Sequence, residues 1–283
     1  MVSAPSRREL VRHLVGKGLS ERRSLRLTGM SPSSFRYQPA TDCNATLKAK
    51  IIALAQRHRR YGAGMIYLKL RQEGMQVNHK RVDRLYAEAG LQIRRRKRRK
   101  VPVADRHPLT RPLVANQVWS MDFVFDRTAE GRVIKNLTVV DDATHEAVAI
   151  VPERAISGLH LTRVLDQLAT TRGLPKAIRT DNGKEFCSRA MLTWAHARGV
   201  QLFLIKPGKP NQNAYIESFN GRFRDEHWFT NLRHAQVVIE AWRREYNNER
   251  PKKALGGLTP VAYAKSLEEK SGKLTSDSKA QRY

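Results

Sequence analysis

The chain has 283 residues, 40% of them hydrophobic, which is enough for one large domain or two to three small ones with a buried core. Its formal net charge of +27 exceeds what solubility requires and indicates a polyanionic partner, most simply nucleic acid. Two cysteines, Cys43 and Cys187, are too few for a zinc tetrad or a disulfide framework, so we expect free thiols in a reducing cytosol. We find no signal peptide and no apolar run of about 18 residues, which predicts a cytoplasmic, nucleoid-associated protein with no membrane contact.

Residues 1–40 predict a module of three short helices, over 7–15, 20–27 and 31–37. Ser20 is a suitable cap for the second helix, and Ser31 followed by Pro32 opens the third. Short helices joined by glycine-containing turns are typical of a helix-turn-helix, although any small three-helix bundle would have the same pattern. The third helix is the predicted DNA reader, with Ser33, Ser34 and Arg36 as candidate contacts.

Residues 45–92 predict a second helix-turn-helix-like module, with helices over 46–57, 64–73 and 79–89. Asn78 is the expected cap of the last helix and Gly90 its stop. The apolar side of this helix leaves three cations free to face phosphate: Lys80, Arg81 and Arg84. The two modules therefore predict two tandem DNA readers.

Residues 93–112 predict a basic linker. It contains seven consecutive cations, which no packed domain can bury: Arg94, Arg95, Arg96, Lys97, Arg98, Arg99 and Lys100. Residues 1–100 hold 25 Lys and Arg against 6 Asp and Glu, a net charge of +19, which leaves +8 for the other 183 residues. We expect the run to bind DNA phosphates as an interdomain arm; a solubilising spacer is the alternative.

Residues 113–232 predict a mixed α/β core, because strand alternation replaces helical spacing from Asn116 onward. Its expected elements are, in order, three strands (118–125, 133–140 and 146–151), a helix (159–171), a strand (177–181), a helix (185–198), a strand (200–205) and a helix (210–230). This is the order of the ribonuclease H-like fold, a five-stranded mixed sheet in which the first and fourth strands are neighbours. A helical extension follows over 233–266, with a helix over 235–247, and then a disordered tail over 267–283.

Three carboxylates are candidate metal ligands. Asp122 lies inside an apolar strand, where an unpaired charge is costly, and Asp181 ends the fourth strand, where open α/β sheets place their sites. Glu217 shares a polar helix stripe with Asn213, Asn220, Gly221 and Arg224, which could also be a solvated face. Carboxylates without Cys or His suit Mg²⁺ or Mn²⁺. The competing acids are expected to form turns (Asp126, Asp141, Asp142) or to complement a helix dipole (Glu185).

Three motifs resemble the DDE motifs of the retroviral integrase superfamily: Trp119-Ser-Met-Asp-Phe, Thr180-Asp-Asn-Gly-Lys-Glu-Phe and Asn211-Gln-Asn-Ala-Tyr-Ile-Glu-Ser-Phe-Asn-Gly. The 35 residues between Asp181 and Glu217 match that superfamily's spacing, and Arg224 matches its basic residue. Further segments are similar to bacterial insertion-sequence transposases encoded by a second reading frame: Arg60-Tyr-Gly-Ala-Gly, Val77-Asn-His-Lys-Arg-Val and Tyr246-Asn-Asn-Glu-Arg-Pro. The resemblance covers about residues 7–265, with helical modules in place of the retroviral zinc domain.

The resemblance implies a DDE-type polynucleotidyl transferase in which Asp122, Asp181 and Glu217 hold two Mg²⁺ ions, with Mn²⁺ as a substitute. Its implied partners are double-stranded DNA, both inverted repeats and target, further copies of this chain in a synaptic complex, and an upstream-frame protein as fusion or partner. The chain would then be the downstream product alone. Lys206, Lys209 and Arg224 are expected to contact DNA near the site. A same-fold nuclease without strand transfer and a DNA-binding regulator with an inactive core are the alternatives.

Overall fold

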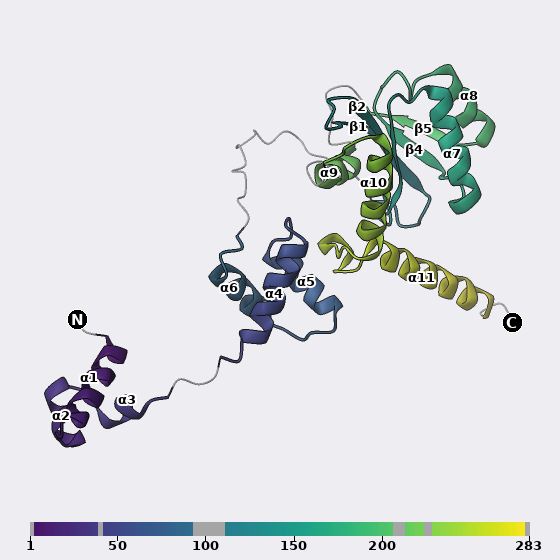
Figure 1. Cartoon of the computed structure of the whole chain (residues 1–283). Helices are drawn as coiled ribbons and strands as arrows, with labels where there is room; N and C mark the ends of the chain where they lie inside the picture. Colours follow the sequence, from purple (N-terminus) through teal and green to yellow (C-terminus); the bar gives the residue numbers. More distant parts are fainter. Residues whose placement is uncertain (1–2, 39–41, 93–110, 206–212, 224–227, 281–283) are drawn as a thin grey trace, which may run out of the picture. The chain divides into compact units, whose positions relative to one another are not determined.

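The computed structural model describes residues 3–38, 42–92, 111–205, 213–223 and 228–280, with side chains through Lys270 (Figure 1). The basic run Arg94 to Lys100 lies outside these residues, as do Lys206, Lys209 and Arg224. The chain forms two compact units, Met1–Leu54 and Ala55–Tyr283, each described below by itself. Across the described ranges, no helix combines the length and the apolar composition that crossing a membrane requires.

The first unit contains three short helices, α1 (Ala4–Gly16), α2 (Glu21–Thr28) and α3 (Pro32–Arg36). Each begins after a serine whose hydroxyl accepts a backbone N–H, which satisfies one of the unpaired donors of the first turn. Val11, Leu25 and Met30 form the small buried core, with Phe35 packed against it. The predicted second and third helices are confirmed, and the first begins three residues earlier than expected.

Three further helices follow, α4 (Ala45–Arg57), α5 (Ala63–Gln72) and α6 (His79–Glu88). Asn78 Oδ1 accepts the Lys80 backbone N–H at 2.9 Å, which confirms it as the cap of α6. Ile66 and Leu70 of α5 are fully buried, as is Val82 of α6. The structure thus confirms the predicted helical module to within one residue at each boundary.

The region that follows is built on a five-stranded sheet, β1 (Val118–Arg127), β2 (Val133–Asp141), β3 (Ala147–Glu153), β4 (Ala177–Thr180) and β5 (Gln201–Leu204). The strand order is β3-β2-β1-β4-β5. The first three strands form an antiparallel meander, and β4 and β5 run parallel to β1. This confirms the predicted mixed sheet, with β1 beside β4 at its centre.

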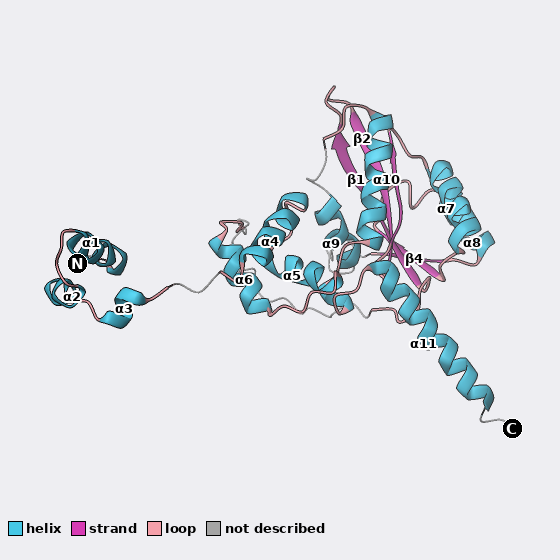
Figure 2. Cartoon of the chain, turned by 60° about the horizontal axis from the view of Figure 1, so that its bottom comes forward, coloured by secondary structure: helices cyan, strands magenta, loops and turns pink. Residues whose placement is uncertain are grey.

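Helices cover both faces of the sheet (Figures 1 and 2). On one face lie α7 (Gly158–Arg172) and α8 (Arg189–Arg198), whose Leu161 and Trp194 join a core with Trp119 and Ile178 of the sheet. On the other lie α9 (Ala214–Phe223) and α10 (Leu232–Asn248), which add an aromatic cluster to a second core: Phe219, Phe223, Trp242 and Tyr246. Cover on both faces explains why every residue of β2 after Val133 is buried, including the polar Lys135, Asn136, Thr138 and Asp141.

The structure corrects three predicted segments. Helix α8 begins at Arg189, not Glu185, because Ser188 caps it and Glu185 lies in the preceding turn. Within the expected helix over 210–230, the described residues form helix only over Ala214–Phe223. Beyond the short helix η2 (Lys253–Leu255), α11 (Pro260–Ala280) extends through most of the predicted disordered tail. No proline follows Pro260, and Ala, Leu, Glu and Lys are frequent, so the local propensity favours helix.

Candidate active site

Asp122 and Asp181 lie on adjacent parallel strands. The β1–β4 register pairs Ser120 with Arg179, so two further residues along each strand place Asp122 level with Asp181. Asp181 directly follows the end of β4, at the carboxyl edge where sites of α/β sheets lie. Its Oδ1 accepts the Gly183 N–H at 2.9 Å. A Cβ at Gly183 would stand 3.0 Å from that same oxygen, so a larger residue would push the Asp181 carboxylate from its position by a few tenths of an ångström.

Asp122 is held from two sides. Its Oδ1 accepts the Phe123 backbone N–H at 2.8 Å, and its Oδ2 accepts Nδ2 of Asn220 at 2.7 Å. Thr138 on β2 lies opposite Asp122, and its hydroxyl is 3.0 Å from both the Asp122 carbonyl oxygen and Asn220 Oδ1. Asn220 and Thr138 are both buried. These contacts orient the Asp122 carboxylate and tie α9 to the centre of the sheet.

Glu217 lies in the first turn of α9 and is exposed to solvent. It precedes Asn220 by three residues, about one helical turn, so the contact between Asn220 and Asp122 brings its helix to the site. No three His, Cys, Asp or Glu side chains within the described ranges are close enough to hold a metal ion. The structure therefore brings Asp122 and Asp181 to neighbouring strands. The Glu217 carboxylate is not close enough to both of them to form a three-carboxylate metal site.

Of the acids expected to form turns, Asp126 lies within β1 instead, where its Oδ1 accepts the Arg127 backbone N–H. The other two, Asp141 and Asp142, are neutralised by basic side chains. Arg179 Nη1 lies 2.5 Å from Oδ2 of Asp142, and Arg172 Nη2 contacts Asp141 at 3.3 Å and Glu146 at 2.5 Å. Burial raises the pKa of Asp142 to about 6, although a hydrogen bond from Ser120 and the charge of Arg179 oppose this. These acids form a buried structural network, and so the turn-forming role expected for Asp141 and Asp142 is only part of what they do.

Glu185 is also neutralised, although by a different partner from the one predicted. Its Oε1 accepts a hydrogen bond from Lys135 Nζ at 2.5 Å, and this hydrogen bond lowers the pKa of the Glu185 carboxyl group. The Lys135 ammonium also lies 3.9 Å from the centre of the Phe123 ring. Because α8 begins four residues later, the expected dipole role of Glu185 is wrong.

By contrast, no Lys or Arg in the described part of the chain forms an ion pair with Asp181 or Glu217. Carboxylates at a sheet edge that lack a protein counter-charge can bind a cation from solution. Their oxygens suit Mg²⁺ or Mn²⁺, and within the described ranges neither Cys43 nor Cys187 belongs to a group of side chains that could hold a metal. The donor set therefore fits the divalent ions that the motifs imply.

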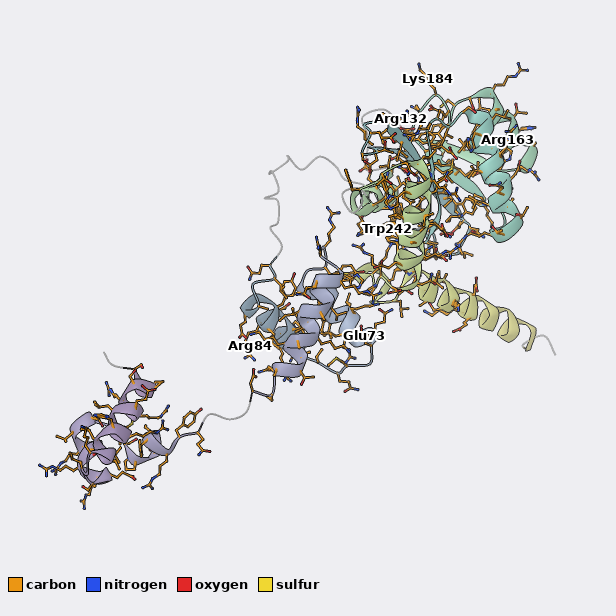
Figure 3. The ribbon with its side chains drawn as sticks, viewed as in Figure 1. Glu73, Arg84, Arg132, Arg163, Lys184 and Trp242 are labelled. Carbon is orange, nitrogen blue, oxygen red and sulfur yellow. The ribbon has the colours of Figure 1, made fainter. Side chains whose placement is uncertain are left out.

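The predicted DNA contacts that are described are all exposed except Arg81. Ser33 and Ser34 are exposed, but both take part in the hydroxyl network around Ser31 that caps α3. Arg36 is paired with Glu21 at 2.9 Å. On α6, Lys80 and Arg84 are exposed, Arg81 is half-buried, and Arg84 is 3.5 Å from Glu88 (Figure 3).

Three residues at or beside the site were not predicted as functional. Asn220 was placed on the polar stripe of its helix, and its spacing from Glu217 was the available signal. Thr138 gives no local signal, because a threonine in an apolar strand is ordinary. Lys184, in the loop after Asp181, is an exposed cation beside the site that was likewise not singled out (Figure 3).

Models of known protein families match most of the chain. Models of the integrase core domain match residues 113–210 and 198–260, and a model of an HTH-like domain matches residues 42–99. Among solved structures, the HTLV-2 integrase catalytic core domain in complex with magnesium aligns with a TM-score of 0.44 at 16% identity, over 54% of this chain and 99% of that chain.

Two relatives share about half of their residues with this chain. The insertion element IS407 31.7 kDa protein of Burkholderia multivorans is 52% identical, over 87% of this chain and 91% of the relative. The insertion element IS476 39.2 kDa protein of Xanthomonas euvesicatoria is 49% identical, over 92% of this chain and 78% of the relative. The chain therefore belongs to the bacterial insertion-sequence transposases that carry an integrase core domain and an HTH-like domain.

Proposed function

We propose that this protein is a DDE-type transposase that binds the terminal inverted repeats of its element, nicks DNA there and joins the freed 3′-hydroxyl to target DNA. The observation that carries the proposal is the placement of three acids relative to one another. Asp122 and Asp181 stand level on adjacent strands, with Glu217 on the helix anchored to Asp122. The neighbouring acids Asp141, Asp142 and Glu185 are all paired with basic side chains.

Asp122, Asp181 and Glu217 would hold two Mg²⁺ ions, or Mn²⁺ in their place. When bound, such ions activate the attacking oxygen and stabilise the leaving oxygen of a phosphoryl transfer. The chain's own contribution is positioning: Asn220 and the Phe123 N–H orient the Asp122 carboxylate, and the Gly183 N–H orients that of Asp181. No side chain needs to become covalently attached to DNA.

Both chemical steps balance without an energy-rich cofactor. In nicking, a water oxygen forms a bond to phosphorus while the bond to the 3′ oxygen breaks, which leaves a 3′-hydroxyl and a 5′-phosphate. In joining, that 3′-hydroxyl loses its proton, attacks a target phosphodiester and displaces the target's own 3′ oxygen, which takes up a proton. One phosphodiester is formed for each one broken in the joining step.

The partners follow from this chemistry. Two element ends must be held together during joining, so we propose a homo-oligomer on DNA as the active form. The α3 and α6 helices are the proposed readers of the inverted repeats, and the run Arg94 to Lys100 a phosphate-binding arm. We also propose that the protein acts with an upstream-frame protein, as a fusion or as a partner. We propose that it associates with the nucleoid.

The deciding experiment is incubation with DNA that carries the native element ends, a target plasmid and Mg²⁺. A second substrate has one end already cut to expose its 3′-hydroxyl. We expect nicks at the ends and joined products, both abolished by Asp181→Asn. Asp126→Asn is the matched control, because Asp126 is also an acid of β1 but lies four residues beyond Asp122, away from the level of Asp181, and it should retain both activities.

Two outcomes would overturn the proposal. Nicking without joining, even from the pre-cut end, would indicate a nuclease. Binding to the ends with neither reaction, in the chain alone and fused to its upstream frame, would indicate a regulator with an inactive core.

A further inference from the structure

A second polar feature lies beside α9, in the Ala55–Tyr283 unit. It is a cavity of about 590 Å³. Its walls come from segments far apart in the sequence: the turn between β2 and β3, helix α9, the end of α10 and helix η2. The residues that matter here are His145, Tyr215, Arg222, Arg250, Lys252 and Lys253.

The cavity collects positive charge without compensation from its walls. Four of its lining residues are cationic, Arg222, Arg250, Lys252 and Lys253, and none of the described lining residues is Asp or Glu. Two acids that adjoin lining residues in the chain are paired elsewhere: Glu146, next to His145, lies 2.5 Å from Arg172, and Glu249, next to Arg250, lies 3.7 Å from Lys69 and 3.5 Å from Arg57. Such a concentration of like charge in a recess is the pattern of an anion site.

Lys252 shows that the cationic side chains lining the cavity repel one another. It is only 7% exposed, and its Nζ donates to the His145 carbonyl oxygen at 3.2 Å and to the Tyr246 hydroxyl. Burial, and then the charges of Arg222 and Arg250, hold the pKa of this amine well below its usual range. An anion in the cavity would offset this repulsion.

His145 supplies a second, independent sign of a ligand. Its φ of 59° is in the left-handed region, which His, like Asn and Asp, adopts more often than other non-glycine residues. Its Nε2 is buried and has no hydrogen-bond partner among the described residues. Burial and the nearby cation Lys252 lower the pKa of this imidazole to about 3, so the ring is neutral and can donate one N–H.

We propose that this cavity binds one phosphate group of the DNA backbone and anchors the strand at a point separate from the candidate metal ligands. The identity of the ligand rests on the proposed function, because DNA is the polyanion on which the enzyme acts. Arg222 follows Glu217 by five residues on α9, about 7.5 Å along the helix axis. A duplex strand advances about 3.4 Å per nucleotide, so the anchored phosphate should lie within a few nucleotides of the cleaved bond.

The first test removes single charges from the cavity. Arg222→Gln and Lys253→Gln should each weaken binding to the element ends on the order of 10-fold or more, the usual cost of losing a charged hydrogen bond. Each should also reduce the log–log salt slope by about 0.9. The matched controls are Arg233→Gln on α10 and Lys265→Gln on α11, exposed cations outside the cavity, which should leave both values unchanged.

Binding is measured by fluorescence anisotropy without divalent metal, so its result does not depend on whether the protein can nick or join DNA. Thermal melting confirms that each variant is folded. Arg222→Lys keeps the charge and should retain most of the affinity. If the cavity variants behaved like Arg233→Gln and Lys265→Gln, the proposal would be overturned, whatever the joining assay shows.

The second test locates the phosphate. A neutral methylphosphonate is placed at one backbone position at a time across the element end. With the unmodified protein we expect one position near the cleaved bond to weaken binding sharply. In Arg222→Gln that same modification should have little further effect, because this variant no longer binds that phosphate. Additive losses at every position would contradict an anchored phosphate.

Discussion

Asn220 donates a hydrogen bond from Nδ2 to Oδ2 of Asp122 across 2.7 Å, although the two residues are 98 positions apart in the chain. The bond joins α9 to the central strand of the sheet, at the level of Asp181. Because Glu217 lies one turn before Asn220, this single contact sets the approach of the third candidate ligand to the first. Asn220 is therefore a positioning residue, and its effect can be separated from that of the carboxylates.

Asn220→Ala should lower the rates of nicking and joining by about 10- to 100-fold, the usual cost of losing a group that orients a metal ligand. It should also raise the Mg²⁺ concentration needed for half-maximal rate, while affinity for the element ends stays the same. Rates measured over a Mg²⁺ titration, with binding measured in parallel, check this.

Thr138→Val provides the matched comparison, since the Thr138 hydroxyl lies 3.0 Å from Asn220 Oδ1. It should have a smaller effect of the same kind, and the double variant should be little worse than Asn220→Ala alone. Fully multiplicative losses would show that the two residues act independently, contrary to the geometry.

Replacing Mg²⁺ should separate DNA binding from chemistry. Ca²⁺ should support binding to the element ends but neither nicking nor joining, because its looser coordination suits poorly a site that positions two small octahedral ions. Mn²⁺ should restore both reactions, and chelation should abolish them with binding retained. Purified protein should contain no stoichiometric zinc, which elemental analysis will show; a full equivalent would contradict the assignment of Cys43 and Cys187 as free thiols.

Replacing Arg94 to Lys100 with Gly and Ser should weaken binding to element ends and to random DNA by similar factors, because phosphate contacts carry no sequence information. The log–log salt slope should fall by about 0.9 for each phosphate that the protein no longer neutralises. Binding isotherms for both DNAs at several salt concentrations measure this. An unchanged affinity and slope for random DNA would make the run a spacer only.

Arg81→Ala on α6 should instead weaken binding to the element ends more than binding to random DNA, since a base contact contributes about 1–3 kcal/mol of discrimination. Arg71→Ala on α5, an exposed cation outside the predicted reader helix, is the control and should not change the ratio of the two affinities. An equal loss on both DNAs would assign Arg81 to the phosphates.

Arg179→Met should cost about 3–5 kcal/mol of unfolding free energy near neutral pH, because it leaves the buried Asp142 carboxylate without its counter-charge. The loss should be smaller at pH 5 than at pH 8. The pKa of Asp142 in the folded protein, about 6, is above its unfolded value of 3.8, so the folded state binds the proton more tightly and ionisation at higher pH opposes folding. Urea unfolding at several pH values measures this.

The control is Arg198→Met, which breaks the solvent-exposed pair with Asp166. Exposed pairs contribute about 0–1 kcal/mol, so this loss should be small at every pH. If Arg179→Met cost the same at pH 5 and pH 8, protonation of Asp142 would not be relieving the unpaired charge.

Local sequence determined much of the fold and of the candidate site. Serine and asparagine caps marked the starts of α2, α3 and α6, because their side chains bond the free N–H groups of a first turn. Alternating apolar residues marked β1, and the order of elements indicated a sheet with β1 beside β4. The positions of Asp122, Asp181 and Glu217 in their motifs were also readable, since motif spacing is a property of the chain alone.

Only the tertiary structure decided which acids carry a free charge. Asp142 and Glu185 are as acidic in the sequence as Asp181, and what distinguishes them is Arg179, 37 residues away, and Lys135, 50 residues away. The basic cavity is also tertiary, because His145, Arg222 and Lys252 meet only when the turn after β2, α9 and the segment after α10 come together. Charge pairing and cavity formation depend on distances between segments remote in sequence, which local periodicity and capping do not encode.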